Sequence, residues 1–340
     1  MIERLDRALE TILARAPSAI AIDDEEISPL AAIASDLRGM PRENFKARLK
    51  SELQRRTVMA SSAQNATPSA QEVPASRREG EAAKVDFIRK GFRSLTPYLI
   101  LDGADNFMEF AKKAFNAEPT FRVPGAQGKV MHAELRVEGE MIEFADSNLE
   151  FPPMPSALHL YVSDVDACYA RALEAGAKSI AGPTDQEYGE RSASVADPFG
   201  NQWYIAKRFA SAPAPANAPQ LIICMRPERS SDVIDFMVNG CGAEVAERFD
   251  GPEGRVIYAK IRLGNSFVEL GDAHGPYQPM PTTIHCYLPD TDAAYQRAIA
   301  AGAKPLREPR DEAYGDRSAG VTDPFGNRWF FATHIRDVKF

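Results

Sequence analysis

The sequence predicts an α+β protein in which one domain occurs twice. The segment YGERSASVADPFGNQWYIA, which begins at Tyr188, recurs as YGDRSAGVTDPFGNRWFFA from Tyr314, 126 residues later. Between residues 187–206 and 313–332, 13 of 20 positions are identical. Within each copy, extended and helical segments follow in the order βαβββ and again βαβββ. A repeat of this length indicates duplication of a whole domain rather than a short solenoid unit.

Each copy contains the same series of elements. An extended segment precedes a helix with apolar residues at helical spacing, strands joined by tight turns, and then a second strand, helix and set of strands. Gly176 and Gly302 follow the alanine-rich second helix of their copies, where a left-handed residue commonly ends a helix. In the first copy we expect strands at 96–101, 130–137, 140–146 and 158–162, and helices at 106–115 and 166–178.

Composition divides the chain into five segments. Residues 1–60 show helical spacing and predict a small helical N-terminal segment, in which the basic stretch 41–56 is either a solvated face or a helix that binds a protein partner. Residues 61–84 contain one large apolar residue, Val73, so a flexible linker is expected over 61–85. The remaining segments are a first domain at 86–210, an Ala/Pro linker at 211–219 and a second domain at 220–340.

Charge and hydropathy exclude several classes of partner. The net charge of −8 opposes binding to nucleic acid or to anionic lipid. No window approaches 18 consecutive apolar residues, and the start MIERLDRALE is charged where a signal peptide is apolar, so we expect a cytoplasmic protein without a membrane partner. The cysteines form no CxxC pattern and are expected to be buried in a reducing compartment; they are Cys168, Cys224, Cys241 and Cys286.

Four motifs of the first copy, each repeated in the second, point to a family. They are TPYLILDGADNFMEFAKKAF, GKVMHAEL, LYVSDVDACYARALEAGAK and YGERSASVADPFGNQW. Together they resemble the vicinal oxygen chelate superfamily of glyoxalases, bleomycin-resistance proteins and ring-cleaving dioxygenases, and most closely its PhnB-like branch. The resemblance covers roughly residues 92–335. It implies tandem domains in which two βαβββ units form a half-open barrel, with a divalent metal on four inward side chains.

Most of the metal ligands that the resemblance implies, usually His or Gln, Glu, His and Glu, are missing from this sequence. Only the fourth-strand carboxylates, Glu143 and Glu269, match the family's pattern. We therefore expect no metal cofactor, because one carboxylate cannot hold zinc or iron. The alternative is a divalent metal bound weakly by a Glu/His pair. The other ligand positions fall on Thr96 and Ile222, Ala157 and Thr283, and Tyr204 and Phe330.

His159 and His285 lie two residues beyond the vacant fifth-strand position and, with a strand period of two, face the same cavity. With Glu143 and Glu269 they are the candidate catalytic residues. The alternatives are hydrogen-bonded core imidazoles and hydrated carboxylates at the barrel mouth. The expected ligand-binding set is His132, Glu143, His159, Tyr188, Arg191, Tyr204, Tyr258, Glu269, His285, Tyr314, Arg317 and Phe330.

Arg191 and Arg317 have two interpretations. Each lies before a DPFGN hairpin, where its guanidinium would either contact an anionic ligand at the pocket mouth or hold its loop to a backbone carbonyl or a local acid such as Glu190 or Asp316. DPFGN itself is turn chemistry. Trp203 and Trp329 are interpreted as core residues rather than pocket wall.

The leading functional hypothesis is a small-molecule-binding protein of the glyoxalase/bleomycin-resistance type, without the usual metal centre and with one pocket in each copy. The second is a lyase, isomerase or dioxygenase that uses an unusual metal set or metal-free acid–base chemistry. The third is a ligand-sensing regulatory protein that acts through its N-terminal helices. The sequence does not identify the ligand.

Overall fold

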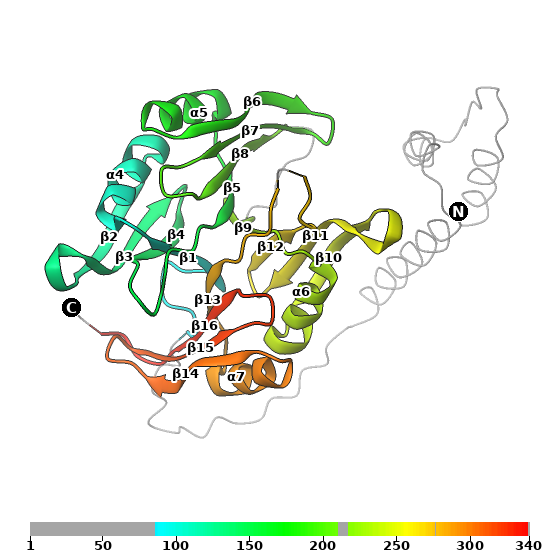
Figure 1. Cartoon of the computed structure of the whole chain (residues 1–340). Helices are drawn as coiled ribbons and strands as arrows, with labels where there is room; N and C mark the ends of the chain where they lie inside the picture. Colours follow the sequence, from blue (N-terminus) through cyan, green and yellow to red (C-terminus); the bar gives the residue numbers. More distant parts are fainter. Residues whose placement is uncertain (1–85, 210–216, 276, 339–340) are drawn as a thin grey trace, which may run out of the picture. The chain divides into compact units, whose positions relative to one another are not determined.

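The computed structural model describes residues 86–209, 217–275 and 277–338. The helical segment expected at 1–60, the linker at 61–85 and most of the Ala/Pro linker at 211–219 lie outside the described residues. Within the described part, two eight-stranded sheets carry helices on their outer faces (Figure 1). No helix in this part of the chain is both long and apolar enough to cross a membrane.

The first copy folds into the two βαβββ units that the sequence predicts. A 3₁₀ turn, η2 (Ala126–Gly128), connects its second and third strands. The first unit consists of β1 (Leu95–Leu101), α4 (Ala104–Phe115), β2 (Glu118–Pro124), β3 (Val130–Val137) and β4 (Glu140–Asp146). The second consists of β5 (Ala157–Tyr161), α5 (Val165–Glu174), β6 (Lys178–Gln186), β7 (Glu190–Ala196) and β8 (Gln202–Arg208).

The second copy repeats this series with one local difference. Its first helix ends in a π-helical turn, η3 (Met237–Cys241), and the 3₁₀ turn η4 (Pro252–Gly254) matches η2. Its first unit consists of β9 (Leu221–Met225), α6 (Ser230–Phe236), β10 (Glu244–Asp250), β11 (Val256–Leu263) and β12 (Ser266–Leu270). Its second consists of β13 (Thr283–Tyr287), α7 (Thr291–Ala300), β14 (Lys304–Asp311), β15 (Asp316–Thr322) and β16 (Arg328–His334).

Each sheet takes one unit from each copy. The first sheet, here called sheet I, has the order β14-β15-β16-β13-β1-β4-β3-β2. The other, sheet II, has the order β10-β11-β12-β9-β5-β8-β7-β6. The expectation of one pocket inside each copy is therefore wrong. Each sheet, and with it each concave face, is built from one unit of each repeat.

Two antiparallel strand pairs join the copies. In sheet I, β1 runs beside β13 and places Thr96 opposite His285. In sheet II, β5 runs beside β9 and places His159 opposite Ile222. Where the units meet between the sheets, the Ser156 and Thr282 hydroxyls, which are equivalent residues of the two copies, form a hydrogen bond of 2.5 Å. The repeats are therefore related by an approximate twofold arrangement inside one chain.

The helices cover the outer faces of the sheets and form the core with them. α4 packs against α5, and α7 packs against the η3 turn that continues α6 (Figure 1). Trp203 and Trp329 are completely buried, which confirms the interpretation of both as core residues. Gly176 and Gly302 have φ angles of 105° and 97°, as expected for residues that end a helix in the left-handed region.

The DPFGN turns are fixed by their aspartates. Asp323 accepts hydrogen bonds from the backbone N–H groups of Phe325 and Asn327, from the Asn327 amide at 2.8 Å and from the Trp329 indole at 3.1 Å. Asp197 makes the equivalent contacts in the first copy. The turn motif thus anchors the core tryptophan of the following strand, and its role is structural, as the sequence predicts.

Asp323→Ala should lower the free energy of unfolding by roughly 3 kcal/mol or more, because it leaves several buried donors without an acceptor. The matched control is Asp290→Ala in the same βαβββ unit. Asp290 accepts one hydrogen bond, from Ala293 N–H, as the N-cap of α7, and its loss should cost about 1 kcal/mol. Urea unfolding of both variants measures the difference, and equal losses would contradict this assignment.

Candidate functional site

The concave face of each sheet is set by the strand period of two. Glu143 on β4 and Glu269 on β12 point to this face, together with the residues two positions away on the same strands. Glu143 is 2% exposed and Glu269 is 8% exposed. A buried carboxylate needs donors, so the side chains around these two residues define the candidate sites.

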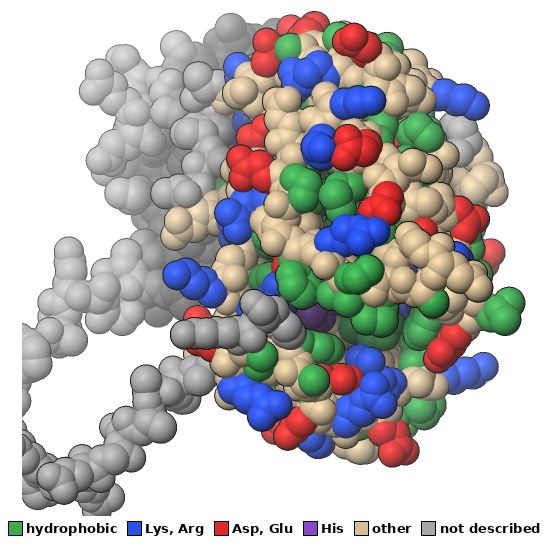
Figure 2. Space-filling model, turned by 90° about the vertical axis from the view of Figure 1, so that its left-hand side faces the viewer, with side chains coloured by type: hydrophobic (Ala, Val, Ile, Leu, Met, Phe, Trp, Pro, Cys, Tyr) green, Lys and Arg blue, Asp and Glu red, His purple; other side chains and the backbone are tan. Residues whose placement is uncertain are grey.

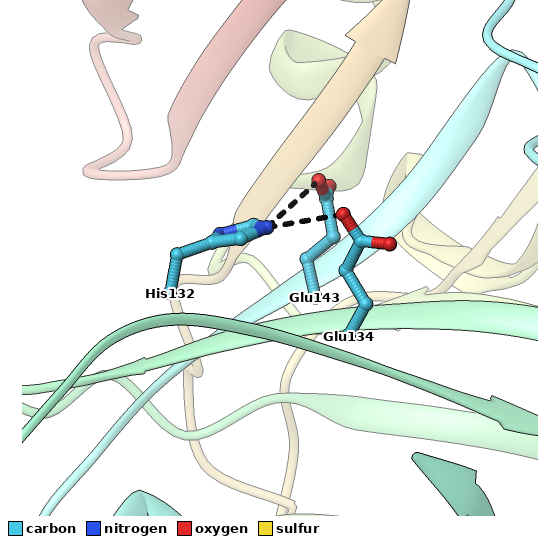
Figure 3. A group of neighbouring side chains, drawn as sticks. All are labelled: His132, Glu134 and Glu143. Atoms are coloured by element: carbon cyan, nitrogen blue, oxygen red, sulfur yellow. Dashed lines mark hydrogen bonds and ion pairs between the residues drawn. The ribbon is translucent and has the colours of Figure 1, made fainter. Parts of the chain in front are cut away.

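In sheet I, Glu143 lies between two histidines. His285 Nδ1 is 2.5 Å from Glu143 Oε2. On the other side, His132 Nε2 is 3.9 Å from Glu143 Oε1, as Figure 3 shows for these two side chains. His132 also lies 3.3 Å from Glu134 and accepts or donates a 3.2 Å hydrogen bond with the Tyr98 hydroxyl. Glu143 and His132 come from the first repeat and His285 from the second, so the site exists only in the assembled sheet.

The Glu143–His285 contact changes the basicity of the imidazole. Burial by itself lowers the pKa of His285, but the charge and the hydrogen bond of Glu143 outweigh it, so that the pKa lies above its ordinary value. The pKa of Glu134 is lowered for a similar reason. Burial opposes ionisation there, and contacts with His132 and Arg89 outweigh it. The raised pKa of His285 favours its imidazolium form, and the lowered pKa of Glu134 favours its carboxylate form.

In sheet II, Glu269 holds the equivalent place with different neighbours. It bonds to His159 Nδ1 at 2.9 Å and accepts from the Tyr258 hydroxyl at 3.1 Å, and the Lys260 ammonium lies 3.7 Å away. Burial raises the pKa of Glu269, but the contacts with His159, Lys260 and Tyr258 outweigh this effect and lower it overall. Lys260 stands where sheet I has Glu134, so the two sites differ in charge at one equivalent position.

A second carboxylate, Glu190, extends the hydrogen-bond and ion-pair network around His159 in sheet II. Glu190 on β7 accepts a 2.8 Å hydrogen bond from the Tyr161 hydroxyl and lies 3.5 Å from Arg208 Nε and 3.9 Å from His159 Nε2. Both ring nitrogens of His159 therefore face carboxylates. The guanidinium of Arg208 also stacks 3.7 Å from the centre of the Tyr161 ring.

The concave face of sheet II opens into a pocket of about 740 Å³. Its wall combines apolar side chains with charged groups of β7, β8, β10 and β11, a composition typical of small-molecule sites. The residues that line it are Tyr188, Gly189, Glu190, Arg208, Asn217, Ala218, Pro219, Ile222, Ala246, Glu247, Lys260, Arg262, Gly264, Asn265 and Phe267.

Arg191 and Arg317 do not reach either cavity, which corrects the prediction that they read the ligand. Arg191 pairs with Asp166 and Asp185, and Arg317 pairs with Asp292 and Asp311. Each follows an inward acid on its strand and therefore points outward. Each arginine does hold a local acid, as the alternative interpretation supposed, although the acid is not Glu190 or Asp316. One partner lies on the preceding strand, with which the arginine's strand pairs, and the other lies in the first turn of a helix.

The other predicted ligand-binding residues are placed as follows. Tyr188 is 72% exposed and lines the pocket of sheet II, whereas its equivalent Tyr314 is 39% exposed. Tyr204 and Phe330 lie on the concave faces beside His159 and His285 in the strand register. Burial raises the pKa of the Tyr204 hydroxyl to about 12. Phe330 packs against Tyr98 with ring centres 5.8 Å apart.

Several residues of these sites were missed from the sequence. Strand parity alone could have found Glu134 and Lys260, which are two positions beyond His132 and Tyr258. Arg208 and Phe267 carry no motif, and their place in the pocket follows from the pairing of the units. Arg89, which lies before β1, gave no signal because its partner Glu134 is 45 residues away.

Comparison of the sequence with known protein families identifies the family of the chain. The model of the glyoxalase/bleomycin resistance protein/dioxygenase superfamily matches residues 98–205 and 223–331, one match for each repeat. The chain belongs to this superfamily. The two matches correspond to the two copies found in the sequence, and the resemblance stated from the motifs is confirmed.

Individual relatives match either one repeat or both. An uncharacterized protein of Mycobacterium bovis is 38% identical over 128 residues, which are 34% of this chain and 82% of that protein. The crystal structure of glyoxalase I from Zea mays is similar with a TM-score of 0.54 at 16% identity, over 70% of this chain and 92% of that one. A PhnB protein from Bacillus cereus covers 33% of this chain and 97% of its own, with 17% identity and a TM-score of 0.28.

The metal set of the superfamily does not fit either sheet. In sheet II the ligand positions hold Glu269 with Ala157, Tyr204 and Ile222, and the Lys260 ammonium lies beside the single carboxylate. In sheet I, His132, Glu134 and Glu143 do offer donor atoms within 4.8 Å of one another (Figure 3). However, the Arg89 guanidinium contacts both oxygens of Glu134 at 2.5 Å, where its charge would repel a divalent ion.

The surface has mixed charge around an apolar hollow. Figure 2 shows a face on which acidic and basic side chains are interspersed, and hydrophobic side chains gather around a hollow where histidine atoms are visible. An apolar hollow with scattered charges is typical of a small-molecule site. A surface that binds nucleic acid or a membrane would instead have a large patch of one sign.

The Glu143–His285 pair predicts a pH-dependent stability. Because the folded pKa of His285 is raised, the stabilisation is complete below the unfolded value of about 6.5 and is lost as pH rises through the folded pKa. Glu143→Gln should therefore reduce the unfolding free energy more at about pH 6 than at about pH 9. Urea unfolding at both pH values measures this. Exposed Glu118→Gln is the control, and an equal or larger loss at the higher pH would refute the assignment.

Proposed function

We propose that the protein binds a small molecule with an anionic group and an apolar body in the pocket of sheet II, without a metal centre. The volume of about 740 Å³ falls within the range of ligand pockets. Membership of a superfamily that includes bleomycin-resistance proteins supports a binding function of this kind.

The observation that carries the proposal is that the Lys260 ammonium lies in the pocket wall with hydrogen-bond donors to spare. Its side chain is 17% exposed and its ammonium lies 3.7 Å from Glu269 and 4.9 Å from the centre of the Phe267 ring. Among the described residues it has these contacts but no hydrogen bond. An ammonium in a half-buried wall retains donors for an anionic acceptor, which would make charge-assisted bonds there.

The acids of the pocket favour the same ligand class. Glu190 already accepts from Tyr161 and lies beside Arg208, while Glu269 already accepts from His159 and Tyr258. These two carboxylates already have donors, whereas Glu247 of β10 is an exposed acid of the pocket wall. Arg208 and Arg262 are paired with Glu190 and Glu244, so Lys260 is the cationic group that retains donors for a ligand. The apolar body would lie against Phe267 and Ile222, which line the same pocket.

A second candidate function is acid–base catalysis by the His159–Glu269 pair. A carboxylate that bonds the Nδ1 atom of a histidine is the arrangement that orients a general base. Against this, His159 Nε2 already faces Glu190 at 3.9 Å. Conversion of a bound compound that stops in His159→Asn, while the compound still binds, would establish catalysis over binding alone.

Lys260→Met should weaken binding of an aromatic carboxylate by roughly tenfold or more, because it removes a charge-assisted contact. The measurement is calorimetric titration of the full-length protein with a panel of aromatic carboxylates and their uncharged methyl esters. Exposed Lys207→Met on β8 of the same sheet is the matched control and should bind as the wild type does. Equal affinity for acids and esters, or no effect of Lys260→Met, would refute the proposal.

Protein purified without chelator should contain well under one equivalent of zinc, nickel, iron or manganese, because the four ligand positions of each sheet supply one carboxylate. Elemental analysis by mass spectrometry measures the content. Stoichiometric metal that disappears in the double variant Glu143→Gln/Glu269→Gln would show that the metal-free proposal is wrong.

A further inference from the structure

The segment that precedes β1 places two side chains, Arg89 and Phe92, against the concave face of sheet I. Arg89 donates hydrogen bonds to both carboxylate oxygens of Glu134 at 2.5 Å. Its guanidinium lies 4.3 Å from the centre of the Phe92 ring, which packs edge-on against Tyr287 at 5.8 Å. Phe92 also belongs to a buried cluster with Met141, Tyr287 and Ala332. These partners lie on β3 and β4 of the first repeat and on β13 and β16 of the second. The segment therefore contacts strands of both repeats in sheet I.

At the equivalent place in sheet II, the described residues leave a pocket. The repeat offset of 126 residues also applies to the segment before β1. Tyr287 N–H donates to Ser94 O, and the equivalent Tyr161 N–H donates to the equivalent Gln220 O. Phe92 therefore corresponds to Ala218, which lines the 740 Å³ pocket. A phenyl ring in sheet I stands where sheet II has a methyl group and space.

The cavity of sheet I is acidic where that of sheet II carries a cation. Glu134 and Glu143 are both 2% exposed, and Lys260 takes the place of Glu134 in sheet II. Two neighbouring buried carboxylates are costly unless a cation compensates them. The charge of Glu143 also contributes to raising the pKa of Arg89, which places the guanidinium within electrostatic range of both carboxylates.

We propose that the concave face of sheet I around Glu134 is a second binding site, for an organic cation of the guanidinium type, and that Arg89 occupies it as an internal ligand. A single guanidinium nitrogen, Nη2 of Arg89, donates to both oxygens of Glu134. The guanidinium carbon lies over the Phe92 ring, so the planar cation is held by a carboxylate and by an aromatic face. The two sheets then differ in occupancy: the chain itself fills the site of sheet I, whereas the described residues leave a pocket in sheet II. This inference does not depend on the ligand proposed for sheet II.

Removal of the Arg89 side chain tests the proposal by chemical replacement. In the full-length Arg89→Ala variant, ethylguanidinium should raise the melting temperature by roughly 3–5 °C at ten times its dissociation constant. Ethylurea, which has nearly the same shape without the charge, should have no such effect. The wild type should not respond, because Arg89 fills the site. Arg122→Ala, which breaks an exposed ion pair with Asp105, is the matched control and should not respond either.

The carboxylate that binds the cation is tested by a double variant. Arg89→Ala/Glu134→Gln should lose the response to ethylguanidinium. An equal response of the wild type, of the double variant or to ethylurea would overturn the proposal. Stoichiometric binding of Zn²⁺ or Mn²⁺ to Arg89→Ala without a response to ethylguanidinium would overturn the assigned ligand class. If Arg89→Ala does not fold, the same titrations are made with Arg89→Gln, which keeps most of the side chain without its charge. The same responses then support or overturn the proposal.

Discussion

The antiparallel pairing of β1 with β13, and of β5 with β9, is the constraint on which both candidate sites depend. Each βαβββ unit contributes four strands, and its first strand is left with one unpaired side until it meets the other copy. Backbone hydrogen bonds satisfy that side by joining units from different repeats. Every concave face therefore contains residues of both copies, and neither cavity can be built from one repeat alone.

The central carboxylates show what this pairing provides. Glu143 and Glu269 are buried, and the imidazoles that hydrogen-bond to them, His285 and His159, come from the other copy in each case. Separation of the repeats would leave a carboxylate without its principal donor, which is strongly unfavourable in an apolar environment. The same contacts that define the sites thus also hold the two copies together.

Side chains at a few equivalent positions make the two cavities different on one common framework. Lys260 replaces Glu134 and reverses the charge beside the central carboxylate. Ala218 replaces Phe92 and leaves a pocket where sheet I is filled. The turn aspartates and core tryptophans are the same in both copies, because they maintain the strands rather than the cavities. Duplication has preserved the framework while the cavity walls have diverged.

The sequence by itself determined the duplication, the order of elements and the central carboxylates. Strands at 130–137 and 140–146 were predicted with the bounds that the structure has, because alternating apolar residues and a tight turn are local signals. The repeat and its motifs indicated the superfamily, which comparison confirms. Glu143 and Glu269 were recognised because each lies at the family's fourth-strand position in both copies.

Only the tertiary structure decided which units share a sheet and which side chains share a cavity. The exchange of units between copies depends on hydrogen bonds between strands far apart in the chain, such as β1 and β13, and no local pattern records that choice. Arg191 was misplaced because its motif suggested a pocket mouth, whereas strand parity turns it outward to Asp166. Arg89 was missed because a buried ion pair between distant residues forms only when folding brings them together.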